Sequence, residues 1–454
     1  MIQAGSNNTP VAIIGGGFAG LAAAAELEKN GIEYVLFEAT DRLGGRVYPI
    51  QDRAEYINGD DNEIYRIAKK LDVLDEKYSD YWMFQSNVSY GIGGGKFSEE
   101  DLQTWKEFAE PLEEEFESAG LKFPRLSAAE FFEKKYKAFL EKIKKNRSTF
   151  DALAKLYRSY YETEWSSPMD ELALDNFQEW DDKSNDSTSW FLDGEGFKAI
   201  LDHLKNNVTL SNVKFKSKVS NLNWTEGYVT TTLNGKEDAL KFNHAIVTVP
   251  LGFLKNNSNL FTPKLPKVKR DAIKYIGFGS LVKVFLEYDK RWWKPSDDVL
   301  MTASLDENDS EEKNITDYMR IFQVHEKNRL LLWLDGEGPK IAAKLSNEEL
   351  ADIITRHLRI QFNNTDIPNP KAIYTHNWTA DELTRGAYSY ITPDSYENLN
   401  DSFLDMAEPV VKDNRPLLCF AGEHTHQTMY QTTVGAYESG IREAQRLVKY
   451  IKKE

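Results

Sequence analysis

Three glycines near the start of the chain are spaced as a phosphate-binding turn. Gly15, Gly17 and Gly20 form a G-x-G-x-x-G that follows the short apolar run Val11–Ile14. In such a turn the first glycine permits a tight bend, the second lets the backbone approach a pyrophosphate, and the third lets a helix pack against a strand. The pyrophosphate then lies at the helix N-terminus, where free N–H groups and the helix dipole favour an anion. The spacing therefore predicts a dinucleotide site.

The elements around this turn are those that a dinucleotide site needs. Residues 21–29 are strong helix formers, and Asn30-Gly31 ends the predicted helix. Residues 32–37 read as a second buried strand that ends at Glu38. A carboxylate about 20 residues after the glycines binds the ribose hydroxyls, and it disfavours a cofactor with a 2′-phosphate.

A second loop, Asp41-Arg42-Leu43-Gly44-Gly45-Arg46, follows the predicted second strand. Its last arginine is either a surface side chain or a pyrophosphate ligand that neutralises charge beyond the reach of the helix end. Residues 38–46, E-A-T-D-R-L-G-G-R, resemble the flavin-containing amine oxidase family, and the overall pattern is closest to polyamine oxidases. The resemblance implies FAD as the cofactor, with Glu38 on the ribose and Arg46 on the pyrophosphate.

Two further blocks carry the same resemblance. The C-terminal block, residues 415–447, contains a predicted buried strand at 417–420, then Gly422-Glu423, then a helix from Val434 onward. The resemblance implies that Gly422 and Glu423 contact FAD and that Thr433 and Val434 lie beside the isoalloxazine. The pair Lys218-Val219 is similar to a family segment in which the valine backbone contacts adenine.

One lysine is a candidate for the chemical step. Lys283 lies between Val282 and Val284 in a predicted strand, residues 280–288. Taken alone, such a lysine is either a surface residue of an edge strand or a buried polar residue with a functional role. Its segment is similar to the family segment whose lysine holds a water against flavin N5, which implies a catalytic role for Lys283.

Residues of the expected substrate wall match the family less well. Trp378 resembles a tryptophan that packs near the flavin, and Tyr388 resembles an aromatic wall that suits a cationic nitrogen. Thr432 stands where monoamine and plant polyamine oxidases have a second tyrosine, and Asn58 stands where polyamine oxidases use an acidic residue or histidine. Ala387 replaces the flavin-linked cysteine of monoamine oxidases, so we expect noncovalent FAD.

The resemblance implies an FAD-dependent oxidase of polyamines that uses O2 and water and releases an aldehyde, a shorter amine and hydrogen peroxide. Glu164, Asp60 and Asp61 are candidates for binding distal amines. One alternative is an L-amino-acid oxidase, which needs a pocket arginine for the carboxylate; no arginine stands in a recognisable place, and Arg53 is left open. Another is a non-catalytic FAD-binding protein, against which Lys283 argues.

The wider pattern predicts an α/β fold with a discontinuous Rossmann-like FAD-binding domain and an α+β substrate domain that has a sheet and flanking helices. We expect the FAD-binding domain at residues 1–82, 188–275 and 396–454, and the substrate domain at 83–187 and 276–395. Segments 97–120, 127–146 and 148–164 show helical periodicity with heavy charge, whereas 213–249 alternates as strands.

Composition limits the partners. The 454 residues carry 56 basic and 72 acidic side chains, a net charge of −16, which argues against nucleic acid and favours a cationic ligand. No apolar run is long enough for a membrane span, so we expect none. The single cysteine, Cys419, excludes an internal disulfide, and His424 and His426 lack the further ligands of a metal site.

Twelve Asn-x-Ser/Thr sequons suggest N-glycans and a secreted protein, with a cytoplasmic location as the alternative. They begin at Asn7, Asn87, Asn146, Asn185, Asn207, Asn223, Asn256, Asn308, Asn314, Asn363, Asn377 and Asn400. No signal peptide is visible, and the first residues look like those of a mature chain to which an initiator methionine has been added.

Overall fold

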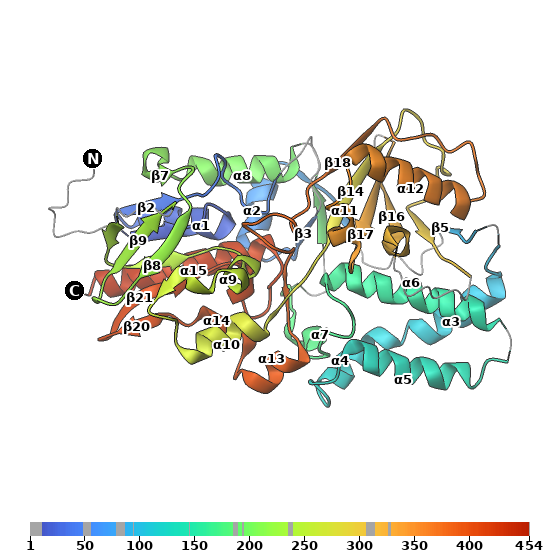
Figure 1. The fold of residues 1–454 in the computed structure, drawn as a ribbon, viewed down its shortest axis with the longest axis horizontal. Coiled ribbons are helices and arrows are strands. Elements are labelled where there is room, and N and C mark those ends of the chain that lie inside the picture. The colour runs from blue at the N-terminus through green and yellow to red at the C-terminus, as the bar shows by residue number, and fades with distance from the viewer. Residues whose placement is uncertain are drawn as a thin grey trace. The chain divides into compact units, whose positions relative to one another are not determined.

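The chain divides into two compact units in the computed structural model (Figure 1). The structure describes residues 11–48, 56–78, 87–93, 95–144, 146–184, 189–192, 195–234, 239–305, 314–325 and 328–453. Unit 1 comprises Met1–Ser79, Glu179–Ile276 and Asp394–Glu454, and unit 2 comprises Asp80–Gln178 and Gly277–Pro393. The α/β class is confirmed, whereas the assignment of FAD to one unit and substrate to the other stays a prediction.

Unit 1 is built on a mainly parallel six-stranded sheet with the order β20-β21-β11-β1-β2-β7. Its strands are β1 (Val11–Ile14), β2 (Tyr34–Phe37), β7 (Val213–Lys214), β11 (Ala245–Val247), β20 (Val410–Lys412) and β21 (Arg415–Phe420). β1 pairs in parallel with both β2 and β11, and β21 pairs in parallel with β11, whereas β20 is antiparallel at the edge. The carboxyl ends of β1, β2, β11 and β21 therefore meet at one edge, where open α/β sheets bind ligands.

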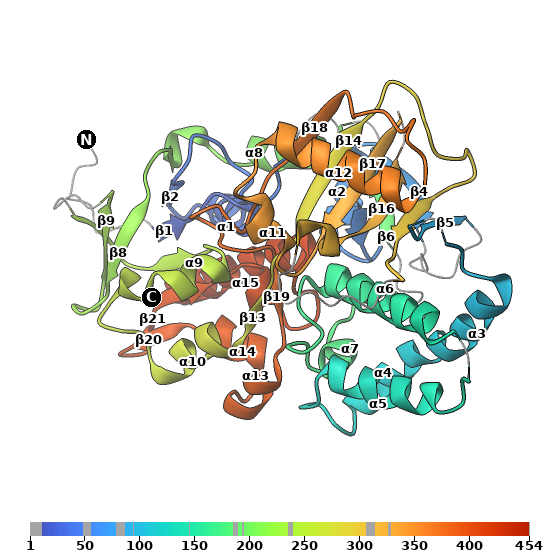
Figure 2. The same cartoon turned by 45° about the vertical axis from the view of Figure 1, so that its right-hand side comes forward.

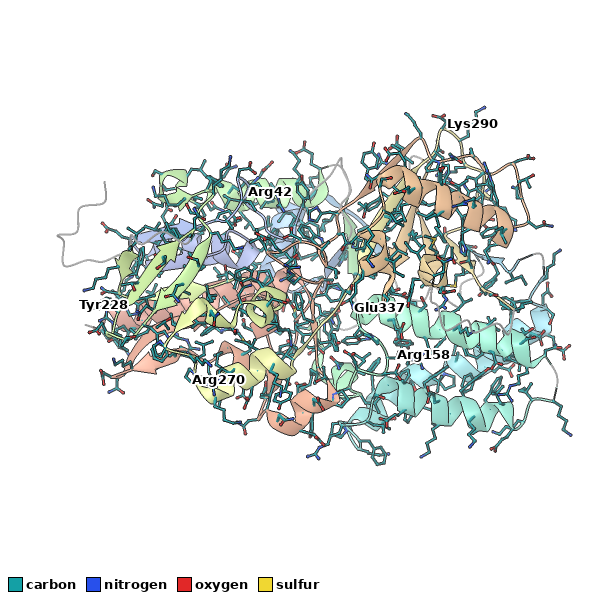
Figure 3. All side chains as sticks on the ribbon, in the orientation of Figure 1. Arg42, Arg158, Tyr228, Arg270, Lys290 and Glu337 are labelled. Carbon is teal, nitrogen blue, oxygen red and sulfur yellow. The ribbon has the colours of Figure 1, made fainter. Side chains whose placement is uncertain are left out.

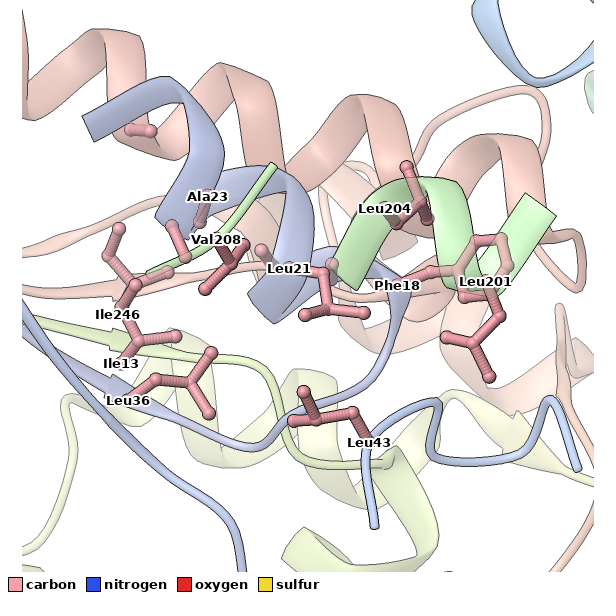
Figure 4. Close-up of a cluster of buried hydrophobic side chains, with 14 of the residues drawn as sticks. Ile13, Phe18, Leu21, Ala23, Leu36, Leu43, Leu201, Leu204, Val208 and Ile246 are labelled. Atoms are coloured by element: carbon pink, nitrogen blue, oxygen red, sulfur yellow. The ribbon is translucent and has the colours of Figure 1, made fainter. Parts of the chain in front are cut away.

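The first and last long helices of unit 1 cross at close range. α1 (Phe18–Lys29) begins three residues earlier than its sequence suggested, and α15 (Thr433–Ile451) packs against it. A Cβ on Gly440 of α15 would lie 2.1 Å from the carbonyl oxygen of Ala19, so this contact needs glycine. Figure 4 shows the core beside them, which includes Ile13 and Leu36 of the sheet, Leu21 of α1 and Leu204 of α8 (Gly196–Asn206).

Smaller elements complete unit 1. A four-stranded sheet with the order β10-β9-β8-β12 contains β8 (Val219–Asn223), β9 (Val229–Leu233), β10 (Ala239–Phe242) and β12 (Phe261–Thr262). A three-stranded sheet with the order β3-β6-β4 contains β3 (Tyr56–Asn58), β4 (Leu74–Tyr78) and β6 (Ser189–Leu192). Its other helices include α2 (Glu63–Lys70), α9 (Leu251–Asn256), α10 (Lys267–Tyr275) and α14 (Ser402–Ala407). The turn between β8 and β9 contains Glu226 and Gly227.

Unit 2 contains a second six-stranded sheet, with the order β18-β14-β17-β16-β15-β5. Its strands are β5 (Val88–Gly91), β14 (Val282–Glu287), β15 (Val299–Thr302), β16 (Met319–His325), β17 (Arg329–Leu334) and β18 (Ala372–Thr375). One face of β14 and β17 packs against α12 (Asn347–Gln361) in a core that includes Val284, Leu332 and Ile354. Two short strands, β13 (Gly277–Phe278) and β19 (Ser389–Tyr390), form a separate pair.

Four amphipathic helices form the other part of unit 2, α3 (Glu99–Ala109), α4 (Leu112–Gly120), α5 (Ala128–Leu140) and α6 (Arg147–Trp165), as Figure 2 shows. The periodic segment 97–120 is two helices because Pro111, which lacks an N–H donor, lies at the N-cap of α4. Aromatic rings join the helices, with Trp105 of α3 and Phe132 of α5 both against Tyr157 of α6.

Charged side chains cover both units (Figure 3). Arg158 of α6, labelled there, forms ion pairs with Glu133 at 3.3 Å and with Asp170 at 2.7 Å. Among the residues that the structure describes, no helix has the length and apolarity needed to cross a bilayer. In the same residues, no group of three or more His, Cys, Asp or Glu side chains is placed to hold a metal ion.

Candidate active site

The glycine turn has the backbone that its sequence predicts. Gly15 has φ of +111°, a conformation that side chains rarely adopt, and its N–H donates to the carbonyl oxygen of Phe37 at 2.9 Å. A Cβ on Gly20 would lie 2.0 Å from the carbonyl oxygen of Gly15, so helix and turn could not approach each other with any other residue there. Gly17 approaches the loop glycines, with Gly44 N–H donating to Gly16 at 2.8 Å.

The N-terminus of α1 has the groups that would bind a pyrophosphate. Its N-cap is Gly17, and no side chain caps it. The first N–H groups of a helix have no partner within the helix, so an uncapped N-terminus attracts an anion. This part of the chain therefore fits a dinucleotide phosphate.

Glu38 lies where a ribose ligand is expected. Its carboxylate is buried at the end of β2 and accepts the Gly16 N–H at 2.9 Å and the Thr40 N–H at 2.7 Å. The Thr40 hydroxyl donates to the same oxygen at 2.8 Å. These bonds hold the carboxylate against the glycine turn, at the carboxyl edge of the sheet.

Two residues that the sequence assigned to the cofactor meet in space. Arg46 Nη1 donates to Glu423 Oε1 at 3.0 Å, and the second oxygen of Glu423 accepts the N–H of Gln431 at 3.0 Å. Glu423 is 3% exposed at its side chain and Arg46 is 23% exposed. The guanidinium therefore compensates a buried carboxylate, while its own side chain stays partly exposed to solvent.

The N-terminus of α15 follows the same region. Gly422 has φ of +128°, and its N–H donates to Ser439 Oγ at 2.9 Å. Thr432 is the N-cap: its hydroxyl accepts the Gly435 N–H at 2.9 Å and donates to Met429 at 2.8 Å. Its hydroxyl is thus committed to the helix, which limits the substrate role expected for Thr432.

Three other residues expected to contact the cofactor lie at the start of α15 or of β8. The side chain of Val434 is buried in the unit 1 core, so only its backbone is available to a ligand. Thr433 is the first residue of α15. Val219 begins β8 and is buried. The cofactor roles of all three stay predictions.

Lys283 lies on the face of the unit 2 sheet opposite the apolar core. Its neighbours Val282 and Val284 point into that core, and successive side chains of a strand point to opposite faces. Lys283 pairs directly with Trp333 of β17, and its Nζ lies 4.4 Å from the centre of the indole ring. Burial lowers the pKa of Lys283 from 10.5 to about 7, because removal from water disfavours the ammonium.

The same face carries polar residues that the sequence did not single out. Trp333 Nε1 donates to Gln323 at 3.4 Å, and His325 packs edge-on against Phe285 with ring centres 5.9 Å apart. Burial, and then the charges of Lys283 and Arg329, lower the pKa of His325 to about 4, so its imidazole is neutral near pH 7. Only the strand register brings these side chains beside Lys283, and no motif signals it.

The aromatic candidates lie in the segment after β18. Trp378 packs against His376 with ring centres 4.0 Å apart, and its carbonyl oxygen accepts the Thr384 hydroxyl at 2.6 Å. Tyr388 is half-buried, and its hydroxyl donates to the carbonyl oxygens of Thr163 and Glu164, each at 3.2 Å. The Ala387 N–H donates to Gly279 at 2.8 Å, so this segment lies against the start of β14.

Three of the candidates for the substrate and distal amines lie at the end of β3 and just after it. Asn58 ends β3, and its amide donates to Ser189 Oγ at 3.5 Å. Asp60 is exposed, and Asp61 is paired with Arg66. Arg53, the arginine left open for an amino-acid oxidase, lies outside the described residues.

The family model for flavin containing amine oxidoreductases matches residues 18–448. The chain belongs to this family. The match covers both units, from the first turn of α1 to the last turns of α15, and it confirms FAD as the cofactor of an amine oxidase.

Individual relatives are similar over nearly their whole length. The chain is 27% identical to the human peroxisomal N(1)-acetyl-spermine/spermidine oxidase, over 96% of this chain and 94% of that protein. It is 26% identical to the probable polyamine oxidase 5 of Arabidopsis thaliana, over 97% and 98%. A putrescine oxidase structure with bound putrescine has the same fold, with a TM-score of 0.70 at 18% identity over 97% of this chain and 99% of that one.

FAD, when bound, takes up the two electrons of amine oxidation and passes them to O2. Residues of unit 1 would hold it: the glycine turn and the α1 N-terminus suit the pyrophosphate, and Glu38 suits a ribose. In unit 2, Lys283 can exchange a proton near neutral pH, because its two protonation states have similar free energies there.

Proposed function

We propose that the chain oxidises polyamines at a secondary or primary amine. The observation that carries the proposal is the desolvated lysine over an indole ring, Lys283 on Trp333, in a chain of the amine oxidase family. Relatives named for spermine and spermidine derivatives, similar over 94% of their length, support a polyamine substrate. The net charge of −16 supports a cationic ligand through long-range attraction.

In the proposed reaction, the substrate loses two electrons and two protons, one from the C–H beside the amine nitrogen and one from the N–H, and a carbon–nitrogen double bond forms. Water then adds to this double bond, and cleavage of the resulting carbon–nitrogen single bond gives an aldehyde and a shorter amine. O2 accepts the two electrons and two protons and leaves as hydrogen peroxide. Lys283 would position a water or exchange a proton in this sequence, a role that typically contributes 10²–10⁴-fold, roughly, to rate.

The alternatives have less support. An L-amino-acid oxidase binds an α-carboxylate with a cation, and the relatives named above are amine oxidases. A non-catalytic FAD-binding protein has no use for a desolvated lysine over an indole ring, since the removal of an ammonium from water costs free energy.

Anaerobic bleaching of the flavin absorbance tests the substrate class. Purified protein is mixed with spermine, spermidine, their N-acetylated forms, monoamines and L-amino acids. We expect the fastest bleaching with a polyamine or an acetylated polyamine. Faster bleaching with an L-amino acid would overturn the substrate class but leave the flavin chemistry in place.

We also propose that the chain is secreted and carries N-glycans. Seven sequon asparagines that the structure describes are exposed: Asn87, Asn146, Asn207, Asn256, Asn314, Asn363 and Asn400. Asn223 and Asn377 are half-buried, and Asn377 donates to Pro339 at 2.6 Å, so we expect Asn377 to be unmodified. Asn7, Asn185 and Asn308 lie outside the described residues.

Expression through a eukaryotic secretory route, followed by enzymatic deglycosylation, tests this proposal. We expect a fall in mass that corresponds to several glycans. An unchanged mass would favour the cytoplasmic alternative.

A further inference from the structure

The C-terminal end of α6, residues 163–166, holds two segments that carry the candidate chemistry of unit 2. The carbonyl oxygens of Thr163 and Glu164 accept the Tyr388 hydroxyl, each at 3.2 Å. The carbonyl oxygen of Ser166 accepts the Ser280 N–H at 2.9 Å, just before the strand that carries Lys283. The position of this helix end therefore sets the position of both segments.

Gly279 shows how close this contact is. A Cβ at residue 279 would lie 1.8 Å from the Ser166 carbonyl oxygen, so only glycine permits the approach. Ser166 itself has φ of +49° and caps α6 through its N–H to Thr163 at 3.4 Å. A small shift of α6 would therefore move the start of β14 as well, because the two backbones are in direct contact.

One buried carboxyl group attaches α6 to the strand opposite Lys283. Asp335 directly follows β17, is 1% exposed, and lies two residues beyond Trp333. Its Oδ2 accepts the Ser159 hydroxyl in a short hydrogen bond and the Thr163 hydroxyl at 3.5 Å. Ser159 and Thr163 are one turn apart on α6, so both contacts act on the same face of the helix.

These contacts form a closed circuit of elements. Lys283 of β14 pairs with Trp333 of β17, and Asp335 after β17 is bonded to α6. Ser166 at the end of α6 is in turn bonded to the start of β14. We propose that Asp335 is a positioning residue of the amine oxidase site, which fixes Tyr388 and the Lys283 strand through its hydrogen bonds to α6. This inference rests on the proposed function of Lys283 and Tyr388.

The environment of Asp335 favours a neutral carboxyl. Its second oxygen, Oδ1, is buried without a hydrogen-bond partner. Burial and then the charge of Glu162 on α6 raise the pKa of Asp335 to about 7, although the Ser159 hydroxyl, Arg320 of β16 and the backbone of Asp335 itself act to lower it. Tyr318, which precedes β16, also faces this carboxyl. Above pH 7 the group ionises, and repulsion by Glu162 of α6 and the cost of a buried charge then oppose the attachment of α6, against a stronger hydrogen bond from Ser159.

Hydrogen exchange tests the positioning independently of activity. Ser159→Ala removes one hydroxyl from Asp335, and Thr355→Ala is the matched control, because Thr355 is an equally buried hydroxyl that bonds only within α12. In the FAD-loaded protein we expect amide exchange in peptides 277–285 and 386–390 to accelerate at least fivefold in Ser159→Ala and to stay within twofold in the control. Equal exchange in the two variants would overturn the proposal.

Kinetics test the consequence for the site. At full FAD loading, we expect Ser159→Ala and Asp335→Leu to lower the rate constant of flavin reduction at least fivefold, and Thr355→Ala to change it less than twofold. In a double-mutant cycle with Tyr388→Phe, the Ser159→Ala effect should shrink at least threefold, because the hydroxyl that α6 holds is already absent. If the two substitutions instead lower the rate constant of flavin reduction by independent factors that multiply, Ser159 and Asp335 do not act by positioning Tyr388.

The pH profile separates positioning from general stability. Asp335→Asn keeps an oxygen acceptor for Ser159 but cannot ionise. We expect its reduction rate at pH 6 to stay within twofold of the wild type and its decline at alkaline pH to begin at least half a unit higher. Superimposable profiles would overturn the proposal. If the wild type oxidises no amine, the proposed function fails, and the exchange experiment still decides whether Asp335 positions these segments.

Discussion

At the scale of single residues, the lysine over Trp333 is the group whose chemistry can be tested most directly. Lys283→Met keeps a side chain of similar length, so the packing on the indole ring should survive. We expect FAD to remain bound and flavin reduction or reoxidation to slow at least about tenfold, equivalent to roughly 1.4 kcal/mol of barrier. Stopped-flow absorbance times the two half-reactions separately. Wild-type rates in both, at full FAD loading, would make Lys283 a structural residue.

The same substitution should change the pH dependence of stability. The pKa of Lys283 is lowered to about 7 in the folded chain and is near 10.5 when unfolded, so the unfolded state binds more protons between these values. The wild type therefore gains stability as pH rises from 7 toward 10, and Lys283→Met lacks this gain. Urea denaturation at pH 7 and pH 9 measures the difference. We expect the free energy of unfolding to rise less between pH 7 and pH 9 in the variant than in the wild type. An equal rise in the two proteins would argue against a desolvated amine.

Among single residues, sequence and structure agree best where one backbone position demands one residue type. Gly15 and Gly20 could be assigned from spacing, because a left-handed φ and a 2.0 Å approach exclude other residues. Glu38 could be assigned as well, since it directly follows a buried strand. Asp335, Gln323 and His325 could not, because only the pairing of β16 with β17 and β17 with β14 brings them near Lys283.

At the scale of elements, the turn between β1 and α1 is the decisive one for the cofactor. Gly20→Ala would force the helix away from the Gly15 carbonyl oxygen and disturb the N–H groups that bind the pyrophosphate. We expect the flavin-to-protein ratio to fall at least fivefold. Gly31→Ala is the control, since no atom lies within 4 Å of its added Cβ; its φ of +71° should cost about 1 kcal/mol of stability but leave FAD bound.

Element boundaries were less predictable than element types. The segment 97–120 has continuous helical periodicity, yet Pro111 divides it into α3 and α4. α1 begins at Phe18 rather than Leu21, because the short glycine turn leads straight into the helix. In both cases a local backbone property outweighs the hydrophobic period.

At the scale of the whole molecule, the family match implies a flavoprotein, and Ala387 implies that FAD is held without a covalent bond. We expect the purified protein to be yellow and to release intact FAD on acid or heat denaturation. Absorbance and chromatography of the supernatant measure the release. Flavin that stays with the denatured polypeptide would contradict noncovalent binding.

The contact between α1 and α15 also has a consequence for biosynthesis. Gly440 meets Ala19, and Arg46 meets Glu423, so unit 1 is assembled from segments about 400 residues apart in the chain. At roughly 5–20 residues per second of translation, the first glycine turn waits outside the ribosome for tens of seconds before its partner helix is made. During that interval β1 and α1 expose apolar surface that α15 later covers. Ribosome-bound chains halted before residue 430 should therefore recruit chaperones and acquire no flavin.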